Sequence, residues 1–228
     1  MSPEERQSRR KQLEAAGWPR TLEDLFERTG LTLDDCGHLC VDNQMRFMES
    51  PAMEDASDKI NHAIAPAFNQ LGIRTYWIIW PKNDAHIPRY VSDLEKRNFM
   101  DGAEQLRDVW PADIDRVIPK NCRSAFIQWH YGDAPTLTEQ ILEMDGPDIL
   151  FVTGFFADMC LKSTVEDACE KGYLVVWLED GSNLGEYGEQ QRDAIKRELE
   201  DIGVVFTTSE DAFASIRKRA LYSPAIRL

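Results

Sequence analysis

Short apolar runs alternate with amphipathic helical segments along most of this sequence, and this alternation restricts the possible folds more than any other feature. The strand-like runs cover residues 38–41, 74–80, 148–153, 174–178 and 203–207. The helical patterns cover residues 57–71, 136–144, 158–171, 188–201 and 209–220. Each apolar run is followed by a polar turn, which is typical of strands buried on both faces. The alternation predicts right-handed β-α-β units, and therefore an α/β fold whose mostly parallel sheet is covered by helices on both sides.

The N-terminal residues lie outside this alternation. Residues 3–16 are charged and favour a helix, and a second short helix is predicted between Thr21 and Gly30. A chain of 228 residues suits one domain with a short extension. We therefore expect a helical extension over residues 1–35, docked on the main domain or on a neighbouring subunit, and a catalytic domain over residues 36–228.

The charge and the cysteines indicate the compartment and exclude some partners. The 40 acidic residues exceed the 26 Lys and Arg, for a net charge of −14, which disfavours nucleic acid as a partner. The longest apolar run is too short to span a membrane, and the N-terminus lacks the apolar core of a secretory signal. Five cysteines, an odd number, favour free thiols in a reducing compartment. These features predict a soluble cytoplasmic protein.

Three reactive side chains follow apolar runs. Asp42 ends the first run, Lys120 follows a short apolar stretch at residues 117–119, and Cys160 lies just beyond the run at 148–153. Ligands of open α/β sheets bind outside the carboxyl ends of the strands, so these three residues are candidates for one site. A thiol nucleophile, a carboxylate base and a cation form the set of groups expected for acyl transfer.

Cys160 lies near the start of a predicted helix, with Asp158 as a candidate N-cap. Free N–H groups and the helix dipole at that position would favour a thiolate, and the same N–H groups could stabilise an oxyanion. Structural alternatives exist for each residue. Cys160 could be a small buried apolar residue, Asp42 a helix cap or turn residue, and Lys120 a solvated lysine.

Three sequence motifs carry these residues. They are HLCVDNQMRFM around Asp42, IPKNCRSAF around Lys120, and VTGFFADMCLKSTVEDACEKGY around Cys160. In this order and at these separations, the motifs resemble those of isochorismatase-like cysteine hydrolases, over about residues 36 to 210. The resemblance implies a three-layer α/β/α sandwich with a Rossmann-like sheet and an Asp42–Lys120–Cys160 triad. It also implies a cis peptide bond, by position Phe155–Phe156, and an oxyanion hole made by the N–H groups of Phe156 and Cys160.

The resemblance further implies the chemistry of a small-molecule hydrolase. Such an enzyme would cleave an amide, carbamoyl or ureide C–N bond through a thioester, and would release ammonia or an amine without a cofactor. Members of the family commonly form dimers or tetramers. The candidate substrate-binding residues are Gln44, Phe47, Trp80, Arg123, Phe155 and Phe156, although the aromatic residues could equally belong to the core.

Some members of the family bind a metal through an Asp-x-His pair and a further histidine. Asp84 and His86 match the pair, but the next histidine is His130, beyond the lysine motif. We therefore predict a surface turn at Asp84 and no metal site. Two other functions remain open on the same fold: an isochorismatase-type vinyl ether hydrolase, in which Cys160 would be dispensable, and a non-catalytic binding protein.

Overall fold

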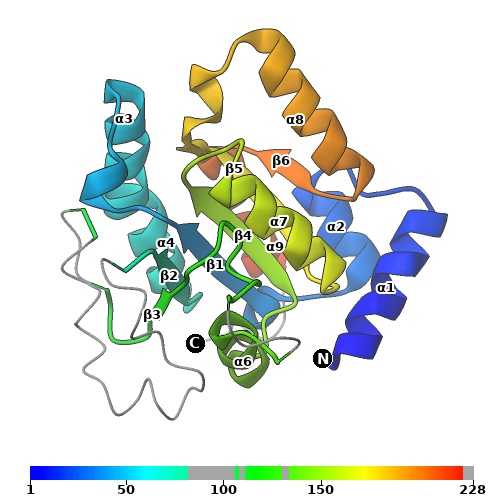
Figure 1. Ribbon diagram of the computed structural model, residues 1–228. Coiled ribbons are helices and arrows are strands. Elements are labelled where there is room, and N and C mark those ends of the chain that lie inside the picture. Colours follow the sequence, from blue (N-terminus) through cyan, green and yellow to red (C-terminus); the bar gives the residue numbers. More distant parts are fainter. Residues whose placement is uncertain (82–105, 108–110, 130–133, 223–228) are drawn as a thin grey trace.

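A six-stranded parallel sheet forms the centre of the protein. The computed structural model describes residues 1–81, 106–107, 111–129 and 134–222. The strands are β1 (Cys36–Val41), β2 (Thr75–Ile79), β3 (Arg116–Pro119), β4 (Ile149–Gly154), β5 (Leu174–Ser182) and β6 (Val205–Thr207). They lie in the order β3-β2-β1-β4-β5-β6 and every pair is parallel (Figure 1). The predicted α/β fold with a parallel sheet is confirmed.

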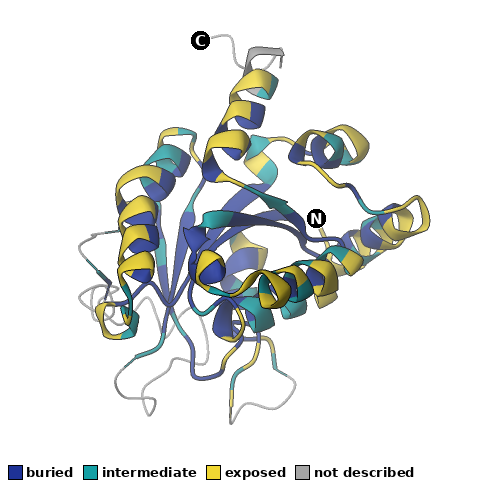
Figure 2. Cartoon of the chain, turned by 90° about the horizontal axis from the view of Figure 1, so that it is seen from above, coloured by how far each residue is buried: buried dark blue, intermediate teal, exposed yellow. Residues whose placement is uncertain are grey.

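Helices cover both faces of this sheet, so the protein has three layers (Figures 1 and 2). One layer contains α2 (Leu22–Thr29), α3 (Pro51–Lys59), the π-helix η3 (Ile60–Ile64), α4 (Ala65–Gln70) and α9 (Ser209–Tyr222). The other contains α6 (Leu137–Asp145), α7 (Cys160–Glu170) and α8 (Glu189–Asp201). The helix predicted at 57–71 already begins at Pro51, because the Ser50 side chain accepts the N–H of Met53 and proline suits the first helical position.

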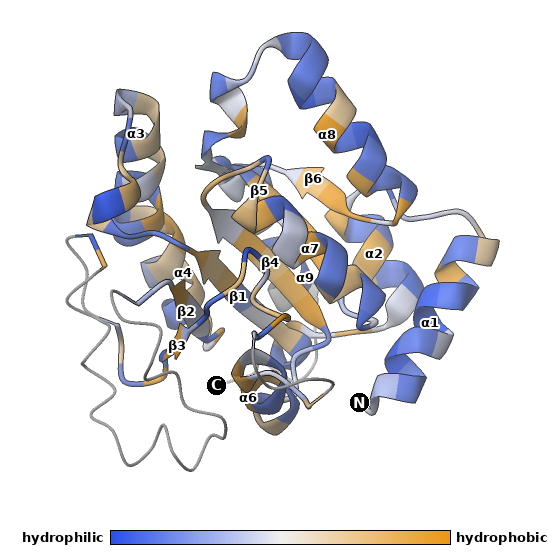
Figure 3. Ribbon diagram, in the orientation of Figure 1, coloured by the Kyte–Doolittle hydropathy of each residue, from blue (hydrophilic) through white to orange (hydrophobic). Residues whose placement is uncertain are grey.

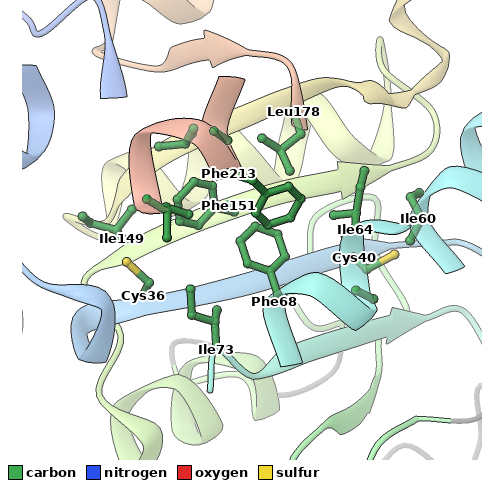
Figure 4. Packing of buried hydrophobic residues seen from close by; sticks show 14 of the residues in the cluster. Cys36, Cys40, Ile60, Ile64, Phe68, Ile73, Ile149, Phe151, Leu178 and Phe213 are labelled. Carbon is green, nitrogen blue, oxygen red and sulfur yellow. The ribbon is translucent and has the colours of Figure 1, made fainter. Parts of the chain in front are cut away.

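Alternate residues of each strand supply two separate cores. In β4, Phe151 belongs to the core under α4 and α9, whereas Leu150 and Val152 belong to the core under α6 and α7. In the first core, the ring of Phe68 lies 5.0 Å from the rings of both Phe151 and Phe213 (Figure 4). The strands are accordingly mostly apolar, while the helices carry hydrophilic residues on their outer sides (Figure 3).

A buried histidine lies within the sheet. His38 of β1 is fully buried, with Nδ1 3.1 Å from Thr75 Oγ1 and Nε2 2.8 Å from Thr153 Oγ1. Burial lowers the pKa of His38 to about 3. The imidazole is therefore neutral, and its two hydrogen bonds satisfy it inside the sheet.

The N-terminal helix α1 (Pro3–Ala15) packs on its own domain, at the edge of the sheet opposite the carboxyl ends of the strands. Arg10 donates to the carbonyl oxygen of Tyr173 at 2.9 Å and to that of Ile202. Arg6 and Arg9 lie 3.9 and 3.7 Å from the carboxylate of Asp148, which precedes β4. Among the described helices, none is long and apolar enough to cross a membrane.

Candidate active site

The three candidate catalytic residues meet at the carboxyl edge of the sheet. Asp42 follows β1 directly, Lys120 follows β3, and Cys160 is the first residue of α7. Strand β2 separates β3 from β1, and the N–H groups of Asp42 and Lys120 bind its Ile78 and Ile79 carbonyls at 2.9 and 2.8 Å. The long lysine side chain then spans β2 and reaches the aspartate.

Asp42 and Lys120 form a buried ion pair. Lys120 Nζ lies 2.8 Å from Asp42 Oδ2, and both side chains are 1% exposed. The ammonium also donates to the carbonyl oxygens of Cys122 at 3.1 Å and Arg123 at 2.9 Å, and it lies 5.0 Å from the centre of the Trp80 ring. These contacts satisfy the ammonium, which stabilises the Asp42 carboxylate.

The Cys160 thiol interacts with the Asp42 carboxylate, whose two buried oxygens have no hydrogen bond of regular geometry beside the ion pair with Lys120. Burial raises the pKa of Asp42, and Lys120 opposes that increase. Burial and the negative charge of Asp42 raise the pKa of Cys160 to about 11, again with Lys120 opposing. Burial and the Asp42 charge thus outweigh the helix start that favours a thiolate, so the thiol keeps its proton and needs a base, the role predicted for Asp42.

The predicted helix cap is also wrong. Helix α7 begins at Cys160, and its N-cap Met159 makes no side-chain cap hydrogen bond. Asp158 lies outside the helix, where its Oδ1 accepts the hydroxyl of Tyr187 at 2.6 Å. Within the described residues, the start of α7 therefore has no N-cap side chain on its N–H groups.

The backbone around the triad adopts unusual conformations. Asp42 has a φ of 54°, in the left-handed region that few side chains favour. Gly154 has a φ of 114°, and a Cβ at this position would lie 1.9 Å from the Val41 carbonyl oxygen. The peptide bond between Phe155 and Phe156 is cis, which confirms that expectation. Only glycine lets the segment after β4 pass so close to β1.

Two backbone N–H groups beside the thiol have no acceptor in the described part of the chain: those of Phe156 and Cys160. The Phe156 carbonyl is used instead by the N–H groups of Met159 at 3.0 Å and Leu161 at 3.1 Å. Two unpaired donors next to a nucleophile are what an oxyanion hole requires. Their role in catalysis stays a prediction.

Aromatic side chains lie beside the triad, but the two adjacent phenylalanines differ. Phe156 is partly exposed and contacts Phe47 edge-to-face, with ring centres 6.0 Å apart. Trp80, also partly exposed, faces Lys120. Phe155 is 0% exposed and belongs to the core. Phe155 therefore offers no surface to a substrate, although it directly precedes Phe156 in the chain.

The two polar candidates for substrate binding also differ. Gln44 is 0% exposed, and its amide pairs with the backbone of Trp80, accepting its N–H at 2.7 Å and donating to its carbonyl at 3.0 Å. Gln44 therefore positions Trp80. Arg123 has an exposed side chain, its carbonyl oxygen accepts from Lys120 Nζ at 2.9 Å, and its role in substrate binding stays a prediction. Arg46 lies nearer the site, donating to the Trp80 carbonyl at 2.6 Å and covering the Phe47 ring.

Sequence reasoning missed a buried amide network behind Asp42. Asn43 accepts the Ser57 hydroxyl at 2.6 Å and donates to Asn61 Oδ1 at 2.7 Å. Asn61 lies in the π-helix, which is frequent at functional sites. The network anchors the residue that follows Asp42. Two polar residues inside an apolar helical pattern were the available signal, because buried polar groups need partners.

A second missed link joins the lysine motif to the nucleophile helix. Thr164 Oγ1 accepts the N–H of Ala125 at 3.1 Å and donates to the carbonyl of Cys160 at 2.7 Å. Ser124 also hydrogen-bonds to the carboxylate of Asp167. The motif residues thus hold the loop after Lys120 against α7.

Asp84, His86 and His130, the residues considered for a metal site, lie outside the described residues. Within the described ranges, no group of three or more His, Cys, Asp or Glu side chains could hold a metal ion.

Comparison with known protein families identifies the domain that carries this site. The sequence pattern of the isochorismatase domain matches residues 36–211, from the first residue of β1 to the first turn of α9. The chain belongs to the isochorismatase family. The match begins where the N-terminal extension was predicted to end, and it contains Asp42, Lys120 and Cys160. Family membership supports hydrolase chemistry.

Solved structures of isochorismatase-like proteins share the fold. N-carbamoylsarcosine amidase from Thermoplasma acidophilum has a TM-score of 0.55 at 20% identity, covering 77% of this chain and 96% of that chain. A cysteine hydrolase from Pseudomonas syringae has a TM-score of 0.57 at 16% identity, covering 82% and 95%. The MAR1 ribonuclease of Caenorhabditis elegans has a TM-score of 0.54 at 21% identity, covering 82% and 83%. No curated protein matches the chain significantly. At these identities the likeness shows the fold alone.

Proposed function

We propose that this protein is a cysteine hydrolase that cleaves a C–N bond of a small amide, carbamoyl compound or ureide through a thioester. The contact between the Cys160 thiol and the buried Asp42 carboxylate carries this proposal. A protonated thiol held against a base is the arrangement that nucleophilic catalysis requires. The amidase and cysteine hydrolase among the structural neighbours support the same class of reaction.

In the first half of the reaction, Asp42 takes the thiol proton and the sulfur of Cys160 forms a bond to the substrate carbonyl carbon. The N–H groups of Phe156 and Cys160 stabilise the resulting oxyanion. The intermediate collapses, the C–N bond breaks, and Asp42 returns the proton to the leaving nitrogen. Ammonia or an amine leaves, and the acyl group stays on the sulfur.

In the second half, Asp42 takes a proton from a water molecule that attacks the thioester. The C–S bond breaks, the carboxylic acid leaves, and the thiol recovers its proton. Asp42 serves as base and acid in turn because two effects on its pKa oppose each other. Burial raises the pKa and favours the protonated form, whereas Lys120 lowers it and favours the ionised form.

The substrate we propose is a small molecule. Phe47, Trp80 and Phe156 offer partly exposed aromatic surface beside the triad, and aromatic walls with a few polar groups are typical of small-molecule sites. The net charge of −14 disfavours RNA, although one structural neighbour is a ribonuclease. Assembly into dimers or tetramers and a cytoplasmic location stay predictions from the sequence.

The test is ammonia release by the purified protein from a panel of primary amides, carbamoyl compounds and ureides, with mass spectrometry of the acylated protein. Cys160→Ala should abolish turnover and the adduct. Cys169→Ala, on the same helix and buried, is the matched control and should retain both. Turnover that survives Cys160→Ala, or hydrolysis of isochorismate by that variant, would instead support the vinyl ether hydrolase. Silence of the wild type on every compound would support the binding protein.

A further inference from the structure

The short helix η7 (Asn183–Glu186) packs against the segment that leads to the nucleophile. Strand β5 reaches this region because a register shift at its end pairs Ser182 with Gly154 of β4. The Ser182 hydroxyl accepts Trp177 Nε1 at 3.1 Å and donates to the Glu179 carbonyl at 3.0 Å. Asn183 therefore directly follows a strand end that is fixed by hydrogen bonds.

The N–H groups of the residues on both sides of Phe156 are anchored. The N–H of Phe155 donates to the Val41 carbonyl at 2.8 Å, and the N–H of Ala157 donates to the side-chain oxygen of Asn183 at 2.9 Å. Ala157 is fully buried and Asn183 is 5% exposed, so water does not compete for this bond. The unpaired N–H of Phe156 lies between these two fixed points.

Tyr187, just after η7, holds the next residue of the same segment. Its hydroxyl donates to Asp158 Oδ1 at 2.6 Å. The amide of Asn183 and the backbone of Asp158 also interact with this hydroxyl. One side chain in η7 and one just beyond it thus engage consecutive residues, Ala157 and Asp158, directly before the nucleophile helix.

We infer that Asn183 and Tyr187 are positioning residues that hold residues 155–160 so that the N–H groups of Phe156 and Cys160 face the developing oxyanion. Neither residue contacts the Asp42–Lys120 pair, so their loss should weaken oxyanion binding without changing the reactivity of the thiol. The inference rests on the proposed function, because it assigns an oxyanion to this place.

The test uses benzaldehyde as a substrate-independent probe. The Cys160 sulfur adds to the aldehyde carbon and the thiol proton passes through Asp42 to the aldehyde oxygen, giving a thiohemiacetal without any redox change. Its oxygen occupies the proposed oxyanion hole. Protection of Cys160 against iodoacetamide, measured by mass spectrometry at increasing benzaldehyde, gives the aldehyde affinity. The alkylation rate without aldehyde reports the thiol itself.

Asn183→Leu should weaken benzaldehyde binding about 30-fold, since displaced oxyanion donors lose most of their effect. Tyr187→Phe keeps the ring and should weaken binding about 5-fold, while alkylation without aldehyde should change less than about 2-fold in both variants. Glu186→Ala is the matched control: it removes the bond between η7 and Ser50 but neither anchor of the segment, and should leave the affinity unchanged. If Asn183→Leu does not fold, the benzaldehyde affinity of Tyr187→Phe alone decides the test.

Equal affinities in all variants, loss of alkylation in parallel with affinity, or no protection of the wild type would overturn the inference. Aldehyde binding that depends on Asn183 in a protein that releases no ammonia would keep the positioning role and reject the proposed reaction.

Discussion

The ammonium of Lys120 lies 2.8 Å from Oδ2 of Asp42, and the two side chains are almost completely removed from solvent. Burying either charge alone is costly, because neither could be solvated. Asp42 also sits in a left-handed backbone conformation behind which Asn43 is anchored by Ser57 and Asn61. The proposed base is thus held by its backbone, by its neighbour and by its counter-ion.

Lys120→Met should destabilise the protein by about 3–5 kcal/mol, because it leaves a buried carboxylate without its partner. The double variant with Asp42→Asn should be less destabilised than the sum of the two single variants. Chemical denaturation measures all four proteins, with the exposed Lys11→Met as the control. Additive effects would show that the two charges are not coupled in the folded protein.

Asp42→Asn should lower the pKa of Cys160 from its value of about 11, because the Asp42 charge raises it and Lys120 remains to lower it. Iodoacetamide alkylation followed against pH should therefore shift its midpoint downward, and at about pH 8 the variant should react faster than the wild type. Turnover should nevertheless be lost with the base. Cys160→Ala supplies the background from other thiols. An unchanged or higher midpoint would contradict the proposed contact between the two side chains.

His38 should make stability depend on pH. Burial lowers its pKa from 6.5 to about 3. As the pH falls, His38 therefore becomes protonated in the unfolded chain at a higher pH than in the folded protein. The contribution of the neutral imidazole is complete above about pH 6.5 and decreases by up to about 1.4 kcal/mol per pH unit below it. Urea denaturation at several pH values should show a shallower slope for His38→Gln. The exposed His62→Gln should keep the wild-type slope, and equal slopes in all three proteins would reject the assignment.

Gly154→Ala should destabilise the protein by at least about 3 kcal/mol, because the added carbon would overlap a backbone carbonyl at a positive φ. Gly185→Ala is the control, since no atom lies within 4 Å of the position that its Cβ would take. Thermal denaturation separates the two variants. A tolerated alanine at position 154 would mean that the segment after β4 can move away from β1.

The order of strands and helices and the edge that carries the site were predictable from the sequence. The periodic spacing of apolar residues can be read locally along the chain, and it predicts strands and helices. Parallel strands place their carboxyl ends at the same edge of the sheet, where ligands bind. That rule was enough to group Asp42, Lys120 and Cys160, although Lys120 comes from a strand that is not adjacent to β1. Strand β5 was predicted to end at residue 178, so the role of Asn183 at its true end was missed.

The amino-acid sequence by itself determined the parallel α/β sheet and the reactive residues at its carboxyl edge, because periodicity and motif spacing are written along the chain. Only the tertiary structure decided that the Cys160 thiol stays protonated, that Phe155 is core while Phe156 borders the site, and that Gln44 supports Trp80. These properties depend on burial and on distances between residues far apart in sequence. Desolvation and charge interactions exist only once the fold has brought those residues together.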